Sequence, residues 1–262
     1  MDLQLQNKVI IITGGKNGIG KGIVLSIAAE GAIPVIINRS PVDDEFVADI
    51  TAVTDTYEYY QLDLNDTDGI APIVEEVYKK YGHIDGIVNN AGANDNCDLE
   101  NTSWRDFEKS LHGNLTHYYE LVHQAVGYLK ESQGSIVNIG SKTALTGQGK
   151  TSAYAAAKGA ILGLTREWAA ALAEDNVRVN AIVVAEAWTP LYARWIKSFG
   201  DEAAQKARLA LIEDKIPLGK RMTSTEEIGD MAAFLLSPRS SHTTGQWLHP
   251  DGGYVHLDRA LN

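Results

Sequence analysis

Short apolar runs alternate with helix-forming stretches along the whole chain, and this alternation limits the fold more than any other feature. Strands are expected over residues 8–13, 33–38, 57–62, 84–89, 135–139, 177–184 and 246–249. Helices are expected between them, from the turn after the first strand to about residue 30 and over 43–54, 66–81, 103–131, 152–174, 201–213 and 225–236. Strands that alternate with helices run parallel and are covered by those helices. The sequence therefore predicts an α/β protein with a single doubly wound parallel sheet and helices on both faces.

Composition and charge exclude several classes of protein. The 262 residues are 44% hydrophobic, which is enough for the core of one domain over 1–262, and no linker divides them. The single cysteine, Cys97, excludes an internal disulfide and is typical of a reducing compartment. A net charge of −11 argues against a nucleic-acid surface. The sequence lacks an apolar segment at its start and any apolar run of about 18 residues, so we expect a cytoplasmic protein without membrane contact.

A glycine-rich turn, TGGKNGIG at 13–20, joins the first expected strand to the first helix. Gly14 permits the tight turn, Gly18 lets the backbone approach a pyrophosphate, and Gly20 lets helix and strand pack closely. In this position the turn predicts a Rossmann-type dinucleotide site. Its candidate residues are Gly14, Lys16, Asn17, Gly18, Ile19 and Gly20.

The end of the second expected strand indicates which dinucleotide binds. An acidic residue there would bind a ribose 2′-hydroxyl and repel a 2′-phosphate. The chain has Asn38 and Arg39 instead, so nothing repels a phosphate and Arg39 could pair with one. NAD(P) is expected, with NADP or dual use favoured. The alternative is that Arg39 stacks on the adenine, which would be neutral between the two cofactors.

Ser141, Tyr154 and Lys158 form a candidate catalytic set. Tyr154 and Lys158 are four residues apart, so they share one face of the expected helix, while Ser141 lies just after a strand. A free tyrosine has a pKa of about 10, and one cation about 4 Å away supplies roughly the 4 kcal/mol needed to lower that pKa to about 7. The set therefore predicts a tyrosinate general base with a serine that holds the substrate oxygen. The alternative is an ordinary pair on a helix surface.

The spacing G-x3-G-x-G, the run Asn89-Asn90-Ala91-Gly92 and the pattern Ser141…Tyr154-x3-Lys158 together resemble the short-chain dehydrogenase/reductase family over the whole chain. The resemblance implies a cofactor half over about 1–140 and a catalytic half over about 141–262.

By that resemblance each of these residues has a role. Tyr154 is the general acid/base, Ser141 orients the substrate, and Lys158 lowers the pKa of the tyrosine and holds the nicotinamide ribose. Asn114 completes a proton relay through water. The remaining cofactor contacts implied are Asp63 and Leu64 at the adenine, Asn90, Ala91 and Gly92 along the cofactor, and Thr189 at the carboxamide. These residues could also have purely structural roles. Asn89 and Asn90 could form a turn, Asn114 could be a hydrogen-bonded polar group, and Asp63 could be a helix N-cap.

The chain departs from the family after the sixth expected strand. Val184 and Ala185 stand where the family usually has Pro-Gly, and Glu186 then falls beside the nicotinamide end. Glu186 either binds a polar substrate or is solvated.

Longer stretches of the second half, among them SKTALTGQG, LTREWAAAL and DGGYVHLDRALN, resemble the L-fucose dehydrogenase branch of this family. The resemblance implies oxidation of an aldose, L-fucose or a related 6-deoxyhexose, at the anomeric carbon to the aldonolactone. A polar mouth fits a sugar better than an acyl chain or steroid. Its candidate substrate residues are Asn94, Lys142, Thr143, Gln148, Glu186 and Trp188.

Other readings stay open. They are a reductase of the same family acting on a keto-acyl or hydroxysteroid substrate, and a catalytically silent module. Trp188, Tyr192 and Trp195 either stack on a sugar or belong to the core. The histidines have no metal-ligand spacing, so no catalytic metal is expected.

Two expectations concern assembly. Small residues of the helix over 152–174, such as Ala156 and Gly163, let another helix approach closely, and by resemblance the chain forms a homo-oligomer, a tetramer. The polar tail over 254–262, with His256, Asp258 and Arg259, is expected to close over a sugar site of its own or a neighbouring subunit. The alternative is a tail that only seals the oligomer.

Overall fold

The computed structural model describes residues 1–257, in which parallel strands form one seven-stranded sheet. The strands lie in the order β3-β2-β1-β4-β5-β6-β7. Their bounds are β1 (Val9–Thr13), β2 (Ile33–Asn38), β3 (Glu58–Gln61), β4 (Gly86–Asn89), β5 (Ser135–Ser141), β6 (Arg178–Val184) and β7 (Trp247–Leu248). The doubly wound parallel sheet predicted from the alternation is confirmed, and each strand lies within about two residues of its expected range.

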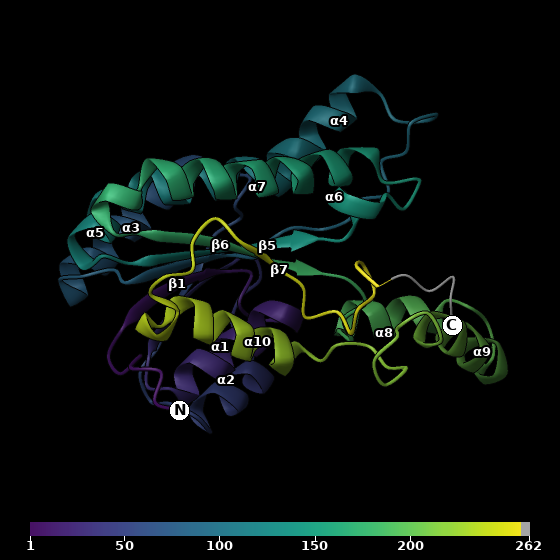
Figure 1. Cartoon of the computed structure of the whole chain (residues 1–262), viewed down its shortest axis with the longest axis horizontal. Helices are drawn as coiled ribbons and strands as arrows, with labels where there is room; N and C mark the ends of the chain where they lie inside the picture. Colours follow the sequence, from purple (N-terminus) through teal and green to yellow (C-terminus); the bar gives the residue numbers. More distant parts are fainter. Residues whose placement is uncertain (258–262) are drawn as a thin grey trace.

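Helices cover both faces of the sheet (Figure 1). One face carries α1 (Gly18–Ala29), α2 (Asp44–Thr51) and α10 (Thr225–Leu236), and the other carries α3 (Ile70–Tyr81), α5 (His117–Ser132) and α7 (Ser152–Ala171). The shorter α4 (Trp104–Leu111) leads into α5, while α6 (Thr143–Thr146), α8 (Pro190–Lys197) and α9 (Glu202–Glu213) follow β5 and β6. None of the helices within residues 1–257 is both long and apolar enough to cross a bilayer.

Alternate residues of each strand point to opposite faces, which explains why central strands such as β1 are continuously apolar. In β1, Ile10 and Ile12 pack under α1 and α10, whereas Val9 and Ile11 pack under α3 and α5. All four side chains are at most 1% exposed. Burial on both faces therefore fixes the register of the central strands and holds their ends in place.

The strand order reverses between β1 and β4, which both pair with neighbours on their other side. Outside the carboxyl ends of the strands at such a reversal lies the usual ligand site of an open α/β sheet. The glycine-rich turn follows β1, Asn90 follows β4, and Ser141 is the last residue of β5. The sheet therefore brings the predicted motifs to one edge.

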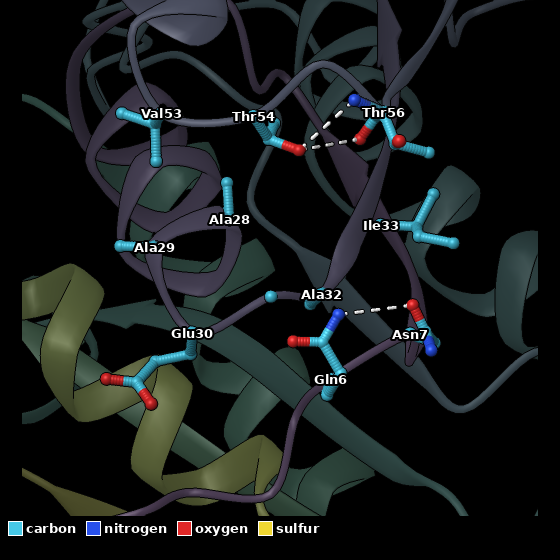
Figure 2. A pocket seen from close by; sticks show the side chains of 11 residues that line it. Gln6, Asn7, Ala28, Ala29, Glu30, Ala32, Ile33, Val53, Thr54 and Thr56 are labelled. Atoms are coloured by element: carbon cyan, nitrogen blue, oxygen red, sulfur yellow. Dashed lines mark hydrogen bonds between the residues drawn. The ribbon is translucent and has the colours of Figure 1, made fainter.

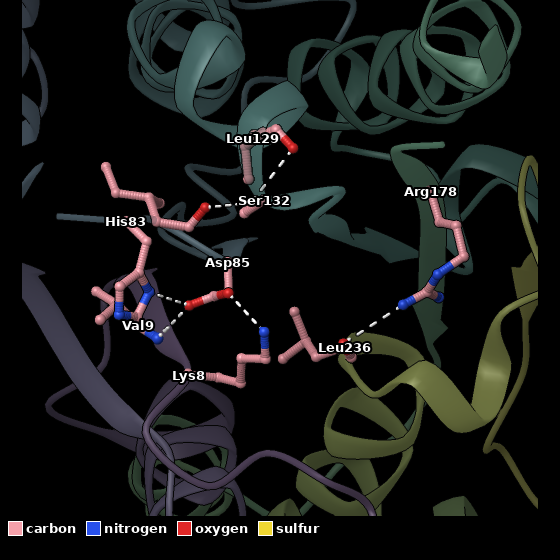
Figure 3. Close-up of polar contacts among 9 residues, drawn as sticks. Lys8, Val9, His83, Asp85, Leu129, Ser132, Arg178 and Leu236 are labelled. Atoms are coloured by element: carbon pink, nitrogen blue, oxygen red, sulfur yellow. Dashed lines mark hydrogen bonds and ion pairs between the residues drawn. The ribbon is translucent and has the colours of Figure 1, made fainter. Parts of the chain in front are cut away.

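The amino edge of the sheet is held together by polar contacts of its own (Figure 3). The Asp85 carboxylate accepts hydrogen bonds from the Val9 amide at 2.9 Å, the Lys8 ammonium at 2.8 Å and the His83 ring at 2.6 Å. Ser132 donates to the Ile84 carbonyl at 2.7 Å and so ties the end of α5 to the same edge. These contacts join β1, β4 and α5 at the end opposite the predicted site.

A recess of about 400 Å³ also lies at the amino edge (Figure 2). It is lined by the loop before β1, the end of α1 and the segment after α2. Its polar groups bond mostly to one another, as between the Gln6 amide and Asn7 at 3.2 Å and between Thr54 and Thr56 at 3.1 Å. The recess contains none of the predicted catalytic residues, so we place the functional site at the carboxyl edge.

Three local features differ from the expected elements. The helix expected over 103–131 contains a π-helical turn, His112–Thr116, and so is not regular throughout. The short helix α6 was not expected, and neither was α8, which Thr189 caps by accepting from the Tyr192 amide at 3.1 Å. Pro190 at the first turn fits the helix start because proline lacks only an amide that would be unpaired there.

Candidate active site

The glycine-rich turn has the conformation that its sequence predicts. Gly14 and Gly18 have φ of +67° and +55°, values that favour glycine. A Cβ on Gly20 would lie 2.1 Å from the Gly14 carbonyl oxygen, so no other residue fits without opening the turn. The amino-terminal end of α1, with its free backbone amides, therefore lies beside the carboxyl end of β1, where a pyrophosphate would bind.

Thr13 and Asn90 lock this turn to the segment after β4. The Thr13 hydroxyl accepts from the backbone amides of Asn90 at 2.9 Å and Ala91 at 3.1 Å. The Asn90 side chain donates back to the carbonyls of Thr13 at 2.9 Å and Gly14 at 3.2 Å. The two walls of the predicted cofactor site are thus fixed relative to each other by reciprocal hydrogen bonds.

Ser141 and Tyr154 meet at the end of β5. The Ser141 hydroxyl is buried and accepts from the Thr143 hydroxyl at 3.0 Å, so Thr143 orients it. Burial raises the pKa of Tyr154, and a hydrogen bond with Ser141 lowers it by less. The predicted pairing of serine and phenol is therefore present, but the tyrosine pKa in the chain alone moves upward, against the prediction that Lys158 depresses it.

Lys158 explains this difference, because its ammonium points into the protein. It is 3% exposed and donates to the Ile139 carbonyl at 2.8 Å and to the Tyr118 hydroxyl at 3.1 Å. It lies 5.6 Å from the centre of the Tyr154 ring. Burial lowers the pKa of Lys158 to about 7. At neutral pH the lysine is therefore close to its own titration midpoint.

Asn114 lies in the π-helical turn and is 4% exposed. Its side chain accepts from the Ala93 amide at 2.8 Å and donates to the Ser110 carbonyl at 3.0 Å. A Cβ on Gly92 would lie 2.8 Å from the Asn114 side-chain oxygen and 3.9 Å from the Lys158 nitrogen. Gly92 thus leaves a space bordered by the predicted relay asparagine and the lysine.

The adenine end of the predicted site is exposed and polar. Asn38 is bonded to the Ser40 hydroxyl at 2.9 Å, and Arg39 makes no ion pair with any residue of the described chain. The Asp63 carboxylate accepts from the amide and side chain of Asn65 at 3.0 and 2.8 Å, while Leu64 is buried beneath it. Asp63 therefore closes a turn with Asn65 and is not the predicted helix N-cap, since Asp66 occupies that position, and it is exposed to solvent.

Lys16 was predicted to contact the cofactor, yet its side chain is 9% exposed and already paired. Its ammonium donates to the Pro41 carbonyl at 2.7 Å and forms an ion pair with Asp43 at 2.6 Å. The hydrogen bond from Lys16, and next the backbone amide of Phe46, lower the pKa of Asp43. Lys16 thus stabilises the start of α2, and its charge is partly neutralised before any ligand arrives.

Lys142 and Glu186 form an ion pair at the ends of neighbouring strands. Lys142 follows β5 and Glu186 lies two residues after β6, and their side chains are only 12% and 13% exposed. The second carboxylate oxygen of Glu186 accepts from the Tyr192 hydroxyl at 2.9 Å, and the ammonium of Lys142 lies 4.3 Å from the centre of the Tyr254 ring. We call these four residues the mouth cluster.

Of the other predicted substrate residues, Trp188 contacts the mouth cluster, because its ring centre lies 6.3 Å from that of Tyr192. Asn94 accepts from the Asn96 amide at 3.1 Å, and Gln148 is exposed. Trp188 is 45% exposed and so does not belong to the core. Together with Gly18 and Thr189 it lines one end of a recess of about 900 Å³ that continues along α1 and α10.

Tyr118, which contacts Lys158, was missed at the sequence level. Tyr254 begins the tail that was predicted at the sugar site, but its contact with Lys142 was not predicted. Both contacts join residues far apart in the chain, so no spacing rule could reveal them. Of the tail residues predicted at a sugar site, His256 lies 3.2 Å from the His249 ring, whereas Asp258 and Arg259 lie outside the described residues.

The residues present fit a nicotinamide dinucleotide. The turn of Gly14 and Gly18 offers backbone amides for a pyrophosphate. The space that a side chain on Gly92 would fill borders Lys158 and Asn114 at the nicotinamide end. Chemically, the arrangement offers a phenol and a hydroxyl to one carbonyl or alcohol oxygen, with an ammonium 5.6 Å from the centre of the phenol ring.

Comparisons with known proteins agree with this geometry. A family model described as enoyl-(acyl carrier protein) reductase matches residues 14–255. The chain is 35% identical to 3-oxoacyl-(acyl-carrier-protein) reductase FabG of Thermotoga maritima, over 97% of this chain and 100% of that one. It is 32% identical to L-fucose dehydrogenase of Rattus norvegicus, over 94% of this chain and 88% of that one.

A solved structure described as Cj0485 dehydrogenase superposes on the chain with a TM-score of 0.96. The two share 53% sequence identity, and the match covers 100% of this chain and 99% of the other. The relatives carry both acyl and sugar names, so the choice between those substrates rests on the residues of the site.

Proposed function

The chain belongs to the short-chain dehydrogenase/reductase family, and on this premise we propose that it oxidises an aldose, L-fucose or a related 6-deoxyhexose, at the anomeric carbon to the aldonolactone. Membership makes the chain an oxidoreductase that uses NAD or NADP. The sugar is our inference from the mouth cluster.

The observation that carries the proposal is the Lys142–Glu186 ion pair at the mouth. Its carboxylate and ammonium can accept from and donate to neighbouring hydroxyl groups, as a polyhydroxylated ring requires. An acyl chain or a steroid would take water away from the remaining donors and acceptors of this pair without offering hydrogen bonds in return, and burying unsatisfied polar groups is costly. The chain's likeness to L-fucose dehydrogenase supports the same choice.

The catalytic residues divide the work of the oxidation. A bound nicotinamide dinucleotide supplies the acceptor for the hydride that leaves the anomeric carbon. Tyr154, as phenolate, takes the proton of the anomeric hydroxyl, and Ser141 holds the same oxygen. Lys158, when protonated, stabilises the Tyr154 phenolate. Asn114 fixes the backbone beside Gly92 by accepting from the Ala93 amide. Loss of the proton and the hydride leaves a carbonyl at the anomeric carbon, which is the lactone.

The proposal includes NADP or dual cofactor use. Arg39 is exposed beyond β2 without an ion pair among residues 1–257, and Asn38 carries no charge that would repel a phosphate. Lys16 does not add to this preference, because Asp43 already pairs with it. We therefore expect Arg39→Ala to weaken NADP binding more than NAD binding.

We also propose that the protein is a homo-oligomer, a tetramer, which acts on a small-molecule sugar. On α7, Ala156 and Gly163 are exposed, and a Cβ built on Gly159 or Gly163 would meet no atom of the described chain within 4 Å. These small residues leave room for a helix of a second copy. Ala157, in contrast, is fully buried against the sheet, so only part of the small-residue stripe is available. Light scattering tests this assembly.

The function is tested with aldoses and hydroxysteroids in the presence of NAD or NADP, and with keto-acyl thioesters in the presence of NADH or NADPH. We expect cofactor reduction with L-fucose or related pyranoses only. Turnover of a keto-acyl or steroid substrate without turnover of any aldose would replace the proposal by a reductase of that class.

A variant set tests whether the mouth cluster recognises the sugar. Glu186→Gln and Lys142→Met each remove one charge of the pair, and we expect a rise of about tenfold in the KM for the sugar, the loss of roughly one charged hydrogen bond. The cofactor Kd should stay constant. Glu202→Gln on the exposed face of α9 is the matched control. An unchanged KM in both cluster variants would contradict the assigned role.

A further inference from the structure

We propose that Tyr118 is a positioning residue for the reaction: its hydroxyl and the Ile139 carbonyl hold Lys158 so that one N–H of the ammonium faces the cofactor space beside Gly92. The inference rests on the place of Lys158 in the proposed mechanism. It does not depend on which alcohol or carbonyl compound is the substrate.

The geometry around Tyr118 is a closed triangle of hydrogen bonds. Lys158 donates to the Tyr118 hydroxyl at 3.1 Å and to the Ile139 carbonyl at 2.8 Å, and the Tyr118 hydroxyl donates to the same carbonyl at 3.3 Å. Tyr118 itself is fully buried. Three elements meet in this triangle, since Tyr118 lies on α5, Ile139 on β5 and Lys158 on α7.

An ammonium group has three N–H bonds, and the triangle uses two of them. The third N–H can point toward Gly92. Because glycine has no side chain, the space that a Cβ would fill, 3.9 Å from the Lys158 nitrogen, is left open. Without the Tyr118 hydroxyl the ammonium could rotate about its last bonds and lose this direction. Tyr118 therefore decides where Lys158 points.

The groups around Lys158 carry no negative charge at neutral pH, so the Tyr118 hydroxyl matters more for stabilising the Lys158 ammonium. Tyr154 on α7 and His117 on α5 are the other titratable groups that face this region. Burial raises the pKa of Tyr118 well above its usual range, and burial, then the charge of Lys158, lowers the pKa of His117 to about 4. Both groups are uncharged at neutral pH. The lysine, whose pKa burial lowers to about 7, is thus stabilised as a cation by uncharged groups, its two hydrogen-bond acceptors and the rings of Tyr118 and Tyr154.

A merely structural role makes a different prediction. If Tyr118 only filled space and satisfied its own hydroxyl on Ile139, phenylalanine would serve almost as well. Replacing a hydroxyl and leaving its partner otherwise bonded costs stability but does not move the titration of a neighbouring lysine. The pH dependence of cofactor binding separates the two roles.

The test compares Tyr118→Phe with wild type by measuring the Kd for NADH and NADPH as a function of pH, with no substrate present. Loss of the acceptor lowers the pKa of Lys158 further, so the pH above which cofactor binding weakens should move down by about one unit. At pH 7 the Kd should rise about fivefold, because the protonated fraction of Lys158 falls from about one half to about one tenth. With an aldose present, kcat should fall and the KM for the sugar should stay the same.

Tyr128→Phe is the matched control. It removes a hydroxyl from the same helix about 15 Å further along the axis, and it should leave the Kd and its pH dependence unchanged. Thermal unfolding checks that both variants are folded. If Tyr118→Phe does not fold, Tyr118→Met fills the same space without an acceptor and should give the same shift.

The outcomes are distinct. A pH profile and Kd equal to wild type in the folded variant would overturn the role of Tyr118, even if aldoses are oxidised. A shifted profile would support Tyr118 even if no aldose reacts, since the measurement needs no substrate. The failure of the proposed function and the failure of this inference are therefore separable.

Discussion

Replacing Arg178 with methionine is expected to reduce the free energy of unfolding by about 2–4 kcal/mol. Arg178 begins β6, and its guanidinium donates hydrogen bonds to carbonyls at the carboxyl end of α10. Figure 3 shows its bond to Leu236. It donates to the carbonyls of Leu235 at 2.7 Å, Leu236 at 3.4 Å, Ser237 at 3.0 Å and Ser240 at 3.3 Å. Burial lowers its pKa to about 10, so it stays a cation at neutral pH.

The magnitude follows from which carbonyls keep another partner. Leu235 still accepts from the hydroxyls of Ser135 at 2.9 Å and Ser240 at 3.0 Å, and Ser237 still accepts from Ser240 at 3.0 Å. Leu236 loses a contact that is already long. The net loss is thus equivalent to about one charged hydrogen bond, about 1.5–3 kcal/mol. The favourable position of a cation at a helix carboxyl end adds about 0.3–1 kcal/mol.

The assay is urea unfolding followed by circular dichroism, with protein concentration held constant because the chain is expected to assemble. In a separate thermal unfolding experiment the melting temperature should fall by about 5–15 °C, at about 2–4 °C per kcal/mol for a protein of this size. Arg194→Met, on the exposed face of α8, serves as the control and should change stability by less than about 0.5 kcal/mol. A similarly small change in Arg178→Met would refute the argument that this guanidinium holds α10.

Gly20→Ala should weaken cofactor binding at least about 100-fold by titration, because its Cβ clashes with backbone, whereas Gly127→Ala on open helix surface should not. At saturating cofactor, kcat for oxidation should rise between pH 7 and 9, since the pKa of Tyr154 is raised and only its phenolate accepts a proton; Tyr154→Phe should be inactive at each pH while still binding cofactor. Truncation after Val255 should raise the KM for the sugar at unchanged oligomer mass, and an unaltered KM would exclude the tail from substrate binding.

Local patterns were sufficient to predict the sheet and the cofactor turn. The apolar runs around Ile10 and Val137 are buried on both faces, and a glycine-rich turn between strand and helix has few other uses. Ser141 and Tyr154 could be placed together because one ends a strand and the other begins the next long helix. Each of these inferences needs only neighbours in sequence and the rule that parallel strands share an edge.

Contacts between distant residues could not be predicted in the same way. Lys158 was expected beside Tyr154, but its partner is Tyr118, 40 residues earlier, and the burial that raises the pKa of Tyr154 comes from the whole fold. The π-helical turn around Asn114 differs from an α-helix by one residue, which leaves the pattern of apolar side chains nearly unchanged. Lys142 and Glu186 were both predicted at the mouth, whereas their pairing depends on the register of β5 and β6.

Strand β5 begins and ends with a serine, and the two hydroxyls have unrelated partners. Ser135 donates to the Leu235 carbonyl at the end of α10, while Ser141, about 20 Å away along the strand, lies in the candidate active site. Mutant libraries selected for a new sugar therefore belong in the segments after β4, β5 and β6, and libraries selected for heat tolerance belong at the opposite rim. Substitutions that far apart without a shared partner add in their free energies, so winners of the two selections can be combined in one chain.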